Sequence, residues 1–457
     1  MPLTAAVLAG VGGCLAVAVA CGSGPAAPGT RTVITDPAVV FTEPSVPKPG
    51  YLAPVVLAPF GTTVTRVVGD PGTAIAFASG TGTWGSDARH HYSKDQPWSA
   101  DGTLLALQNR NGGTPDLVFL DGATYQPKFG RCGGLSGDDR WHPSPAHPHE
   151  RIAVPGSELM WVDVVTCTKT RSWTLPFSVS GFGSGEGNPS FDGRYAALSD
   201  GTRLFVVDMD PQPPYAPYPN KRIGPVVDIT DCGLPGGCSV DWVSISASGK
   251  YVAIVYTTPA ARIFDVAPGT LAVTARPMPQ IWPGCSGTAA GGYVYDLGHE
   301  DLTLNPFDNN EDVLVGEEHC GNAGKVVAGQ LMGKVAMVRL RDGAITSLTD
   351  PTNEAEPHHI STRSFDRPGW AYVSYHPAPG QRFDDEVIAV KLDGSKAVER
   401  LAHMHSDVTG CYRCETHAVP SRDGLRVLWA SNWMINGAGT GTATLTQAYV
   451  LDSRLIR

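Results

Sequence analysis

Apolar and polar residues alternate in short runs along this chain, and the runs form a phrase that returns about seven times. Each copy has a tight turn, commonly Asp-Gly, then an apolar strand, then a second apolar strand that ends in Asp. Three clear copies read PWSADGTLLAL with DLVFLDG, NPSFDGRYAALSD with RLFVVDMD, and VSISASGKYVAIVY with ARIFDV. Glycine tolerates positive φ and aspartate bonds its own backbone, so these turns predict β-hairpins. No stretch sustains a helical period, and we expect an all-β protein.

The spacing of the turns predicts how the hairpins assemble. The turns lie near Asp101, His147, Asp192, Ser248, Asp308, Asp366 and Asp423. A period of about 45 residues, lengthening to about 60, is typical of a β-propeller, in which one repeat cannot bury its own faces. We therefore predict a seven-bladed β-propeller of four-stranded antiparallel blades. The apolar segment 55–69 is expected to complete the last blade beside QAYVLDS, because an open edge would expose unpaired backbone.

The N-terminal region predicts export. Residues 1–21 are apolar and small, as in a signal peptide. Cys21 follows Ala-Val-Ala, which resembles a bacterial lipoprotein processing site at which Cys21 is lipidated. The region before the apolar run has no Lys or Arg, so ordinary cleavage and secretion is the alternative. Residues 22–55 are rich in Pro, Gly and Ala and are expected to be a flexible tether, with the propeller over 56–457.

These features predict an extracytoplasmic protein, lipid-anchored at the cell surface or in the periplasm, or secreted. Membrane contact is expected only through the lipid, and the protein is expected to be a monomer. Charged residues make up 17% of the chain, the net charge is −10, and Lys and Arg do not cluster. This composition argues against a nucleic-acid surface, which needs a dense basic patch. A local group of Arg and His can still bind a small anion.

Eight cysteines remain after the N-terminal region, and an even number in an exported chain indicates disulfides. Sequence neighbours suggest the pairs Cys132–Cys167, Cys232–Cys238, Cys285–Cys320 and Cys411–Cys414. Cys411-Tyr-Arg-Cys414 with His417 also has zinc-like spacing. An oxidising compartment favours the disulfide, and a mixed Cys/His site that includes Cys320 is the alternative.

The strand before each turn should line the central channel. The channel-facing positions hold Trp98, His142, Asn188, Trp242, His299, His359 and His417. Neutral imidazoles that converge from adjacent blades bind divalent metals well. We therefore predict a metal site at His299, His359 and His417, for Zn, Mn or Ca, with Glu300, Asp301, Glu356 or His358 as further ligands. The alternative is a set of structural histidines that bond one another and channel water.

A second polar group precedes the inner strand of the first clear blade. Its candidate catalytic residues are His90, His91, Tyr92, Arg140 and His142, and its candidate substrate contacts are Arg89, Trp98, Trp141 and Trp242. β-Elimination on a uronic acid needs a cation at the carboxylate, a base for the adjacent proton and an acid for the leaving oxygen. Aromatic rings stack on sugars. The alternative is a polar loop with satisfied histidines.

Several phrases in the late blades resemble a known family. GHEDLTLNP, EPHHISTRSFDRPGWAYVSY, DEVIAVKLDGS and THAVPSRDGLRVLWASNW are similar to secreted bacterial propellers related to polysaccharide lyases of the oligogalacturonate lyase and ulvan lyase types, and more loosely to TolB-like and WD40-like propellers. The resemblance implies a channel metal at positions matching His299, His359 and His417. His90, His91, Tyr92, Arg140 and His142 match the ulvan lyases by residue type.

Two functions follow from these observations. The first is an exported lyase that cleaves an acidic, uronate-containing polysaccharide or oligosaccharide by β-elimination. The second is a non-catalytic, surface-tethered binding or scaffold propeller in which the histidines are structural. A metal-dependent hydrolase is a third interpretation, since a bound metal also activates water.

Overall fold

The computed structural model describes residues 33–210, 222–230, 239–257, 260–277, 293–294, 297–434 and 445–453. The predicted signal peptide, Cys21, Cys232, Cys238 and Cys285 lie outside the described residues. Within the described residues, one short 3-10 turn, η1 (Tyr412–Cys414), is the only helical element. No described helix has the length and hydrophobicity needed to cross a membrane. The prediction of an all-β protein is confirmed.

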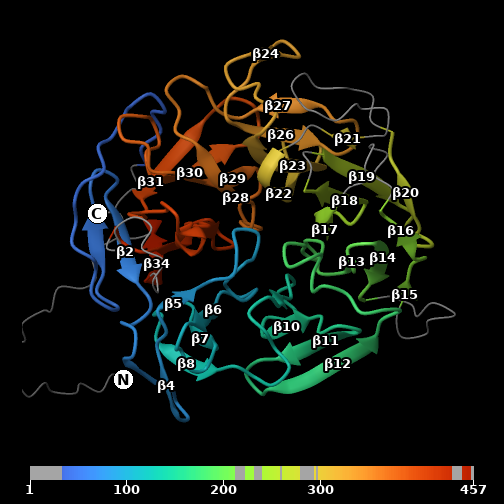
Figure 1. The fold of residues 1–457 in the computed structure, drawn as a ribbon, viewed down its shortest axis with the longest axis horizontal. Helices are drawn as coiled ribbons and strands as arrows, with labels where there is room; N and C mark the ends of the chain where they lie inside the picture. Colours follow the sequence, from blue (N-terminus) through green and yellow to red (C-terminus); the bar gives the residue numbers. More distant parts are fainter. Residues whose placement is uncertain are drawn as a thin grey trace, which may run out of the picture.

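The strands form small antiparallel sheets that follow one another around a ring (Figure 1). The first and last groups share one sheet, which is described below. The second group contains β9 (Arg140–Trp141), β10 (Glu150–Ala153), β11 (Glu158–Asp163) and β12 (Thr168–Thr174). The third contains β13 (Tyr195–Ser199), β14 (Arg203–Asp208), β15 (Arg222–Ile223) and β16 (Val227–Asp228). The fourth contains β17 (Val240–Ile245), β18 (Tyr251–Tyr256), β19 (Ala260–Val266), β20 (Val273–Ala275) and β21 (Tyr293–Val294).

Two further sheets carry the late blades. The fifth group contains β22 (Leu297–Asn305), β23 (Glu311–Glu318), β26 (Val335–Arg339) and β27 (Ile345–Ser347). The sixth contains β28 (Pro357–Ser361), β29 (Trp370–Tyr375), β30 (Glu386–Lys391) and β31 (Val398–His403). Two small hairpins lie outside these sheets: β3 (Ala74–Ala76) with β4 (Thr81–Thr83), and β24 (Val326–Val327) with β25 (Gln330–Leu331).

The two ends of the chain meet in one nine-stranded sheet. It contains β1 (Val55–Leu57), β2 (Thr62–Arg66), β5 (Asp87–Arg89), β6 (Leu104–Arg110), β7 (Leu117–Asp121), β8 (Pro127–Gly130), β32 (Val419–Pro420), β33 (Arg426–Ser431) and β34 (Thr446–Asp452). β2 pairs antiparallel with β34, with Val64 opposite Leu451, which confirms the predicted closure. A parallel pair between β34 and β5 joins the first and last groups. If the sheet is divided between β34 and β5, the strands β5 to β8 form the first group, and β1, β2, β32, β33 and β34 form the seventh. Seven groups of strands agree with the predicted seven blades.

Apolar clusters fill the spaces between successive sheets. One cluster joins Trp161 of β11 to Phe205 and Val207 of β14. Another joins Tyr372 of β29 to Trp429 of β33. Each sheet therefore buries its faces against its neighbours, as the repeat requires.

Two of the four predicted disulfides are confirmed. Cys132 is bonded to Cys167, and Cys411 to Cys414. Cys320 is also disulfide-bonded. The oxidised Cys411 and Cys414 do not act as metal ligands, so the zinc-like interpretation of this motif is excluded in this structure.

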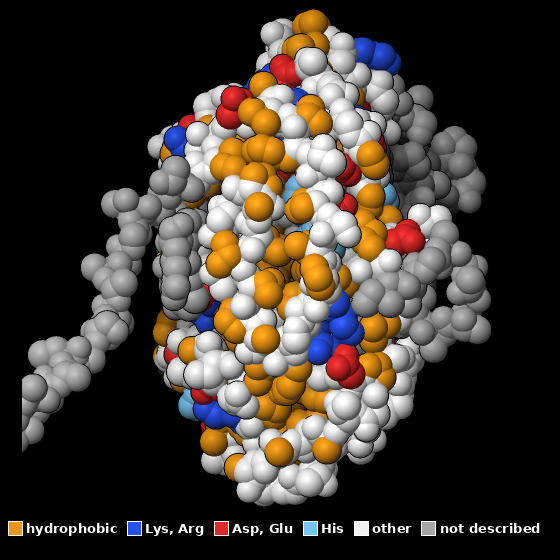
Figure 2. All heavy atoms as spheres, turned by 90° about the vertical axis from the view of Figure 1, so that its left-hand side faces the viewer, with side chains coloured by type: hydrophobic (Ala, Val, Ile, Leu, Met, Phe, Trp, Pro, Cys, Tyr) orange, Lys and Arg blue, Asp and Glu red, His pale blue; other side chains and the backbone are white. Residues whose placement is uncertain are grey.

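Residues 33–55 of the predicted tether make specific contacts with the propeller. Ile34 forms a β-bridge with Arg400, and the Arg400 guanidinium donates to the Val39 carbonyl at 2.7 Å. The Trp433 indole N–H donates to the Val46 carbonyl at 3.0 Å. These bonds hold the described part of the segment against the last two blades. On the side of the ring drawn in Figure 2, Lys and Arg occur in small groups between apolar and neutral side chains.

Candidate metal centre

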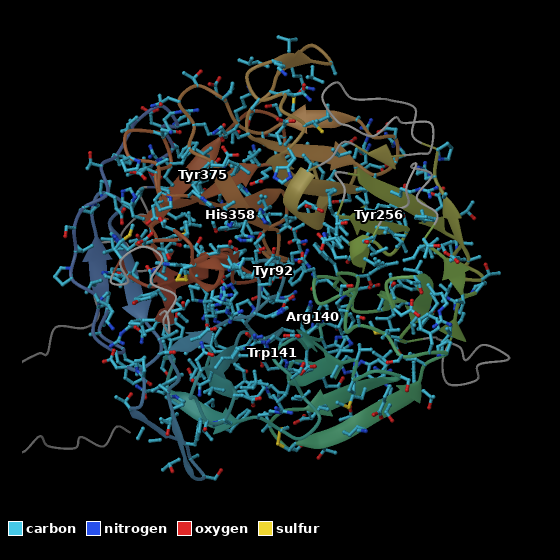
Figure 3. The ribbon with its side chains drawn as sticks, viewed as in Figure 1. Tyr92, Arg140, Trp141, Tyr256, His358 and Tyr375 are labelled. Atoms are coloured by element: carbon cyan, nitrogen blue, oxygen red, sulfur yellow. A yellow bond between two sulfur atoms is a disulfide. The ribbon has the colours of Figure 1, made fainter. Side chains whose placement is uncertain are left out.

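Histidines from three adjacent blades meet at one end of the channel. His299 lies near the start of β22, His358 and His359 lie in β28, and His417 precedes β32. The Asp-Gly turns lie at the far ends of these strands. Figure 3 places the labelled His358 and Tyr92 toward the middle of the ring. The imidazole centroids of His299 and His359 are 4.4 Å apart, and those of His359 and His417 are 3.9 Å apart.

Irregular backbone directs these side chains inward. The pairing register of β22 shifts between Gly298 and Asp301, and that of β28 shifts between Pro357 and His359. A bulge adds an unpaired residue and re-aims the side chain there. Both His358 and His359 therefore reach the cluster. His299 (φ 44°) and His417 (φ 46°) also adopt the left-handed region, which is costly for residues other than glycine.

The Glu415 carboxylate lies at the centre of the cluster. Its oxygens are 3.1 Å from His359 Nε2, 3.2 Å from His358 Nε2 and 3.6 Å from His417 Nε2. Two overlapping groups have ligand atoms close enough to hold a metal ion: His299 with His358 and His359, and His359 with Glu415 and His417. Glu415 was not predicted from the sequence, because it lies in the loop before β32 and not at a repeated strand position.

The protonation and bonding of these groups fit a metal ion. Burial and neighbouring imidazoles hold the pKa values of His359 and His417 well below the usual value, so both rings are neutral. Among the described residues, the buried atoms His359 Nδ1 and His417 Nε2 have no hydrogen-bond partner. Buried polar atoms are normally bonded. Neutral imidazoles and one carboxylate form a donor set that suits Zn or Mn.

A second layer of polar groups surrounds the cluster. Glu317 contacts His319 and faces His299 Nδ1 at 3.8 Å. Burial raises the pKa of Glu317, but the neighbouring imidazoles of His299 and His319 outweigh burial and lower it to about 2. Gly298 leaves the space that the His319 ring fills, because a Cβ at residue 298 would lie 1.9 Å from His319 Cε1. Glu317 is therefore a charged carboxylate that orients two histidines.

Two acidic residues considered as ligands lie elsewhere. Asp301 forms an ion pair with Arg363 at 2.7 Å and accepts the Thr362 hydroxyl at 2.9 Å. Glu356 is paired with Lys334 at 2.6 Å. Glu415 takes the position predicted for a carboxylate ligand.

The side chain of Arg89 is buried and contacts two residues of the cluster. Its guanidinium lies 2.6 Å from His417 Nδ1 and donates to the Glu415 carbonyl at 3.3 Å. The Asp87 carboxylate forms an ion pair with Arg89, with 3.6 Å between Asp87 Oδ1 and Arg89 Nε. This position differs from the predicted substrate contact, because the guanidinium is enclosed by protein groups.

The predicted catalytic loop divides between two environments. His90 Nε2 contacts the His417 carbonyl at 2.5 Å, and burial lowers the His90 pKa to about 3. The Tyr92 ring lies 4.7 Å from the His417 ring, and burial raises the pKa of its hydroxyl. His91 instead contacts Asp95, and its Nε2 is 3.2 Å from Asp138. Of the predicted catalytic residues, Tyr92 and His90 adjoin the metal cluster.

Arg140 and His142 do not face the metal cluster. Arg140 pairs with Asp95 at 2.8 Å and donates to the carbonyls of Gly185 at 2.6 Å and Gly187 at 3.0 Å. His142 packs on His147 with 4.4 Å between ring centroids. The structure therefore does not bring Arg140 and His142 together with His90 and Tyr92 at the metal cluster.

His142 lines a different cavity, near the Asp-Gly turns. The cavity is bordered by Trp98, Trp141, His142, Phe365 and Arg422. A neighbouring cavity is lined by the turn residues Asp101, Asp366 and Asp423, which places both at the end of the channel opposite the histidines.

The three predicted sugar-stacking tryptophans are buried. The indole N–H of Trp98 donates to the Gly122 carbonyl at 3.2 Å, and that of Trp141 to the Pro97 carbonyl at 3.0 Å. The Lys94 ammonium covers Trp242 at 3.9 Å from a ring centroid and pairs with Glu186 at 2.7 Å. These contacts hold the three rings in the protein interior, and Trp98 and Trp141 border the cavity near the turns, away from the histidine cluster.

The fold and site define a β-propeller with a His/Glu cluster at one mouth of its channel. No protein-family model and no curated protein sequence matches this chain. Among solved structures, an oligogalacturonate lyase in complex with manganese is similar over 87% of this chain and 95% of that chain, with 13% identity and a TM-score of 0.54. The likeness shows the fold.

Two other structures are similar with TM-scores below 0.5. An oligogalacturonate lyase from Vibrio parahaemolyticus matches 87% of this chain and 96% of its own, at 13% identity and a TM-score of 0.43. The WD40 domain of Pan2 from Neurospora crassa matches 79% of this chain and 88% of its own, at 10% identity and a TM-score of 0.44.

Proposed function

We propose that this propeller binds a divalent metal ion at the mouth of its channel and cleaves an acidic, uronate-containing glycan by β-elimination. The observation that carries the proposal is the Glu415 carboxylate within 3.1 to 3.6 Å of three imidazole nitrogens. His299, His358, His359, Glu415 and His417 would hold the metal. Similarity to a manganese-bound oligogalacturonate lyase supports the same class of substrate.

The chemistry assigns roles to residues around the cluster. A bound divalent ion supplies positive charge that neutralises the substrate carboxylate, which makes the adjacent C–H more acidic. Tyr92 is the proposed donor of the proton to the leaving glycosidic oxygen, because it is protonated and its ring lies 4.7 Å from the His417 ring. His319 has a partly exposed ring and is oriented by Glu317, so it suits removal of the proton.

The N-terminal sequence supports export of this protein. Residues 1–21 have the pattern of a signal peptide, and Cys21 is the proposed lipidation site. The protein would act outside the cytoplasm as a monomer, either lipid-anchored or secreted. Mass spectrometry of the mature N-terminus from the native host tests this part, because a lipidated Cys21 adds the mass of its acyl chains.

The metal proposal is tested with Glu415→Gln, which keeps the side-chain size and removes the charge. We expect affinity for Mn²⁺ or Zn²⁺, measured by titration calorimetry, to fall at least about tenfold. Glu356→Gln is the matched control, because Glu356 is exposed and paired with Lys334. Equal metal affinity in wild type and Glu415→Gln would contradict the proposed centre.

The reaction is tested with a panel of uronate polysaccharides in the presence of metal. We expect the ultraviolet absorbance of the unsaturated product to rise, and Glu415→Gln to abolish the rise. Metal binding without product from any member of the panel would favour a non-catalytic binding propeller.

A further inference from the structure

Tyr412 presents an exposed aromatic ring beside the proposed metal centre. It is 65% exposed, more than the other exposed aromatic residues in the described part of the chain, Phe307 at 50% and Tyr51 at 37%. It belongs to η1, which immediately precedes Glu415. The Glu415 backbone N–H donates to the Tyr412 carbonyl at 3.3 Å, so the turn is bonded directly to a proposed metal ligand.

The backbone under Tyr412 is fixed by several bonds. The Cys411–Cys414 disulfide closes the turn, and the Cys414 N–H donates to the Cys411 carbonyl at 2.9 Å. Arg413 pairs with Asp87 at 2.7 Å. The Ser406 hydroxyl donates to the Cys414 carbonyl at 2.7 Å. An aromatic ring on a fixed turn loses little entropy when a ligand contacts it.

An aromatic ring on a rigid support can stack on the apolar face of a ligand at little entropic cost. The three tryptophans predicted to stack on sugars are buried. Tyr412 has a free ring, and the ligand atoms of Glu415 and His417 follow it on the same segment.

We propose that Tyr412 is the stacking platform for one pyranose ring of an acidic oligosaccharide, at a subsite adjacent to the metal centre. The inference rests on the proposed function and names a sugar contact for that site. The apolar C–H face of the sugar would lie on the phenol ring, with its carboxylate directed toward the His/Glu cluster. The disulfide sets the position of the platform relative to Glu415.

The test measures binding of trigalacturonate, in the presence of Mn²⁺, to wild type, Tyr412→Ala, Tyr412→Leu and Tyr412→Phe. We expect Tyr412→Ala and Tyr412→Leu to weaken binding about threefold to tenfold and Tyr412→Phe to retain it, since stacking needs the ring. Mn²⁺ affinity, measured without sugar, should be the same in all four. Phe307→Ala is the control, because Phe307 is exposed near an Asp-Asn turn at the other end of its blade.

The outcomes separate this inference from the proposed function. If Tyr412→Ala binds trigalacturonate like wild type while Glu415→Gln does not, the platform is wrong and the metal centre stands. If Tyr412→Phe loses as much affinity as Tyr412→Ala, the hydroxyl makes the contact and stacking is refuted. If wild type binds Mn²⁺ but no trigalacturonate, both the glycan assignment and the platform are overturned.

Discussion

Glu354 shows what burial does to a single carboxyl group in this ring. Its side chain is buried, and it accepts the Tyr375 hydroxyl at 2.8 Å and the Lys334 N–H at 3.1 Å. Burial raises its pKa from 4.5 to about 7, despite these bonds. The folded protein therefore keeps a proton that the unfolded chain releases.

This shift predicts a pH dependence of stability. The contribution of protonated Glu354 is complete below pH 4.5 and is lost as pH rises toward about 7. Glu354→Gln removes this loss. We expect the free energy of unfolding of the variant, relative to wild type, to increase by about 2.5 kcal/mol between about pH 5 and about pH 8. Denaturant titrations at both pH values measure it. The same pH dependence of the free energy of unfolding in wild type and Glu354→Gln would contradict the assignment. Glu356→Gln serves as the control, because the Glu356 carboxylate is exposed.

Gly298 predicts a steric effect beside the metal cluster. A Cβ at this position would collide with the His319 ring at 1.9 Å. We expect Gly298→Ala to cost about 1–3 kcal/mol of stability and to displace His319 from Glu317. Thermal unfolding measures the cost. Gly133→Ala is the control, because no atom lies within 4 Å of its Cβ position. Equal stability of the two variants would show that His319 moves without penalty.

The histidine positions of the centre could be found from the sequence, whereas its carboxylate could not. His299, His359 and His417 occupy the same place before three successive turns, so their convergence follows from the repeat. Glu415 has no repeat position. It depends on a loop closed by a disulfide and on a left-handed His417, which alternation of apolar residues does not encode.

At the scale of elements, the two described disulfides close loops of very different length. Cys132 and Cys167 are 35 residues apart, and Cys411 and Cys414 are 3 apart. In the chain-entropy view, a longer loop restricts the unfolded state more. The two bonds should therefore contribute differently to stability and to the site.

Replacing each pair with serine tests this difference. We expect Cys132→Ser/Cys167→Ser to lower the free energy of unfolding by about 4 kcal/mol and Cys411→Ser/Cys414→Ser by about 2 kcal/mol. The second double variant should also weaken Mn²⁺ binding, because its turn carries Glu415. Denaturant unfolding and calorimetry measure both effects. Weaker metal binding in the first variant alone would contradict the assigned role of the short loop.

Strands and turns were the most predictable elements, because Asp-Gly turns and apolar runs are local signals. The bulges in β22 and β28 were not predicted. A bulge inserts one residue without changing the apolar pattern of its strand, so it leaves little trace in the sequence. Both bulges lie where histidines enter the cluster.

At the scale of the whole molecule, β2 closes the ring by covering an edge of β34. Val64 of β2 is fully buried opposite Leu451. Deletion of residues 1–66 should therefore expose that edge and abolish cooperative thermal unfolding, with aggregation visible by size-exclusion chromatography. Deletion of residues 1–32 is the control and should unfold like the full chain. A cooperative, monomeric product of the longer deletion would show that β2 is dispensable.

β34 also has a consequence for biosynthesis. It pairs with β33 along one edge and with β2 and β5 along the other, so closure of the ring depends on residues 446–452. A ribosome holds the most recently made residues in its exit tunnel. The nascent chain can therefore stack its earlier sheets in order of synthesis, but the ring stays open until residues 446–452 have left the tunnel. During that interval, chaperones would encounter two uncovered edges, those of β2 and β33, which β34 covers together when it inserts between them.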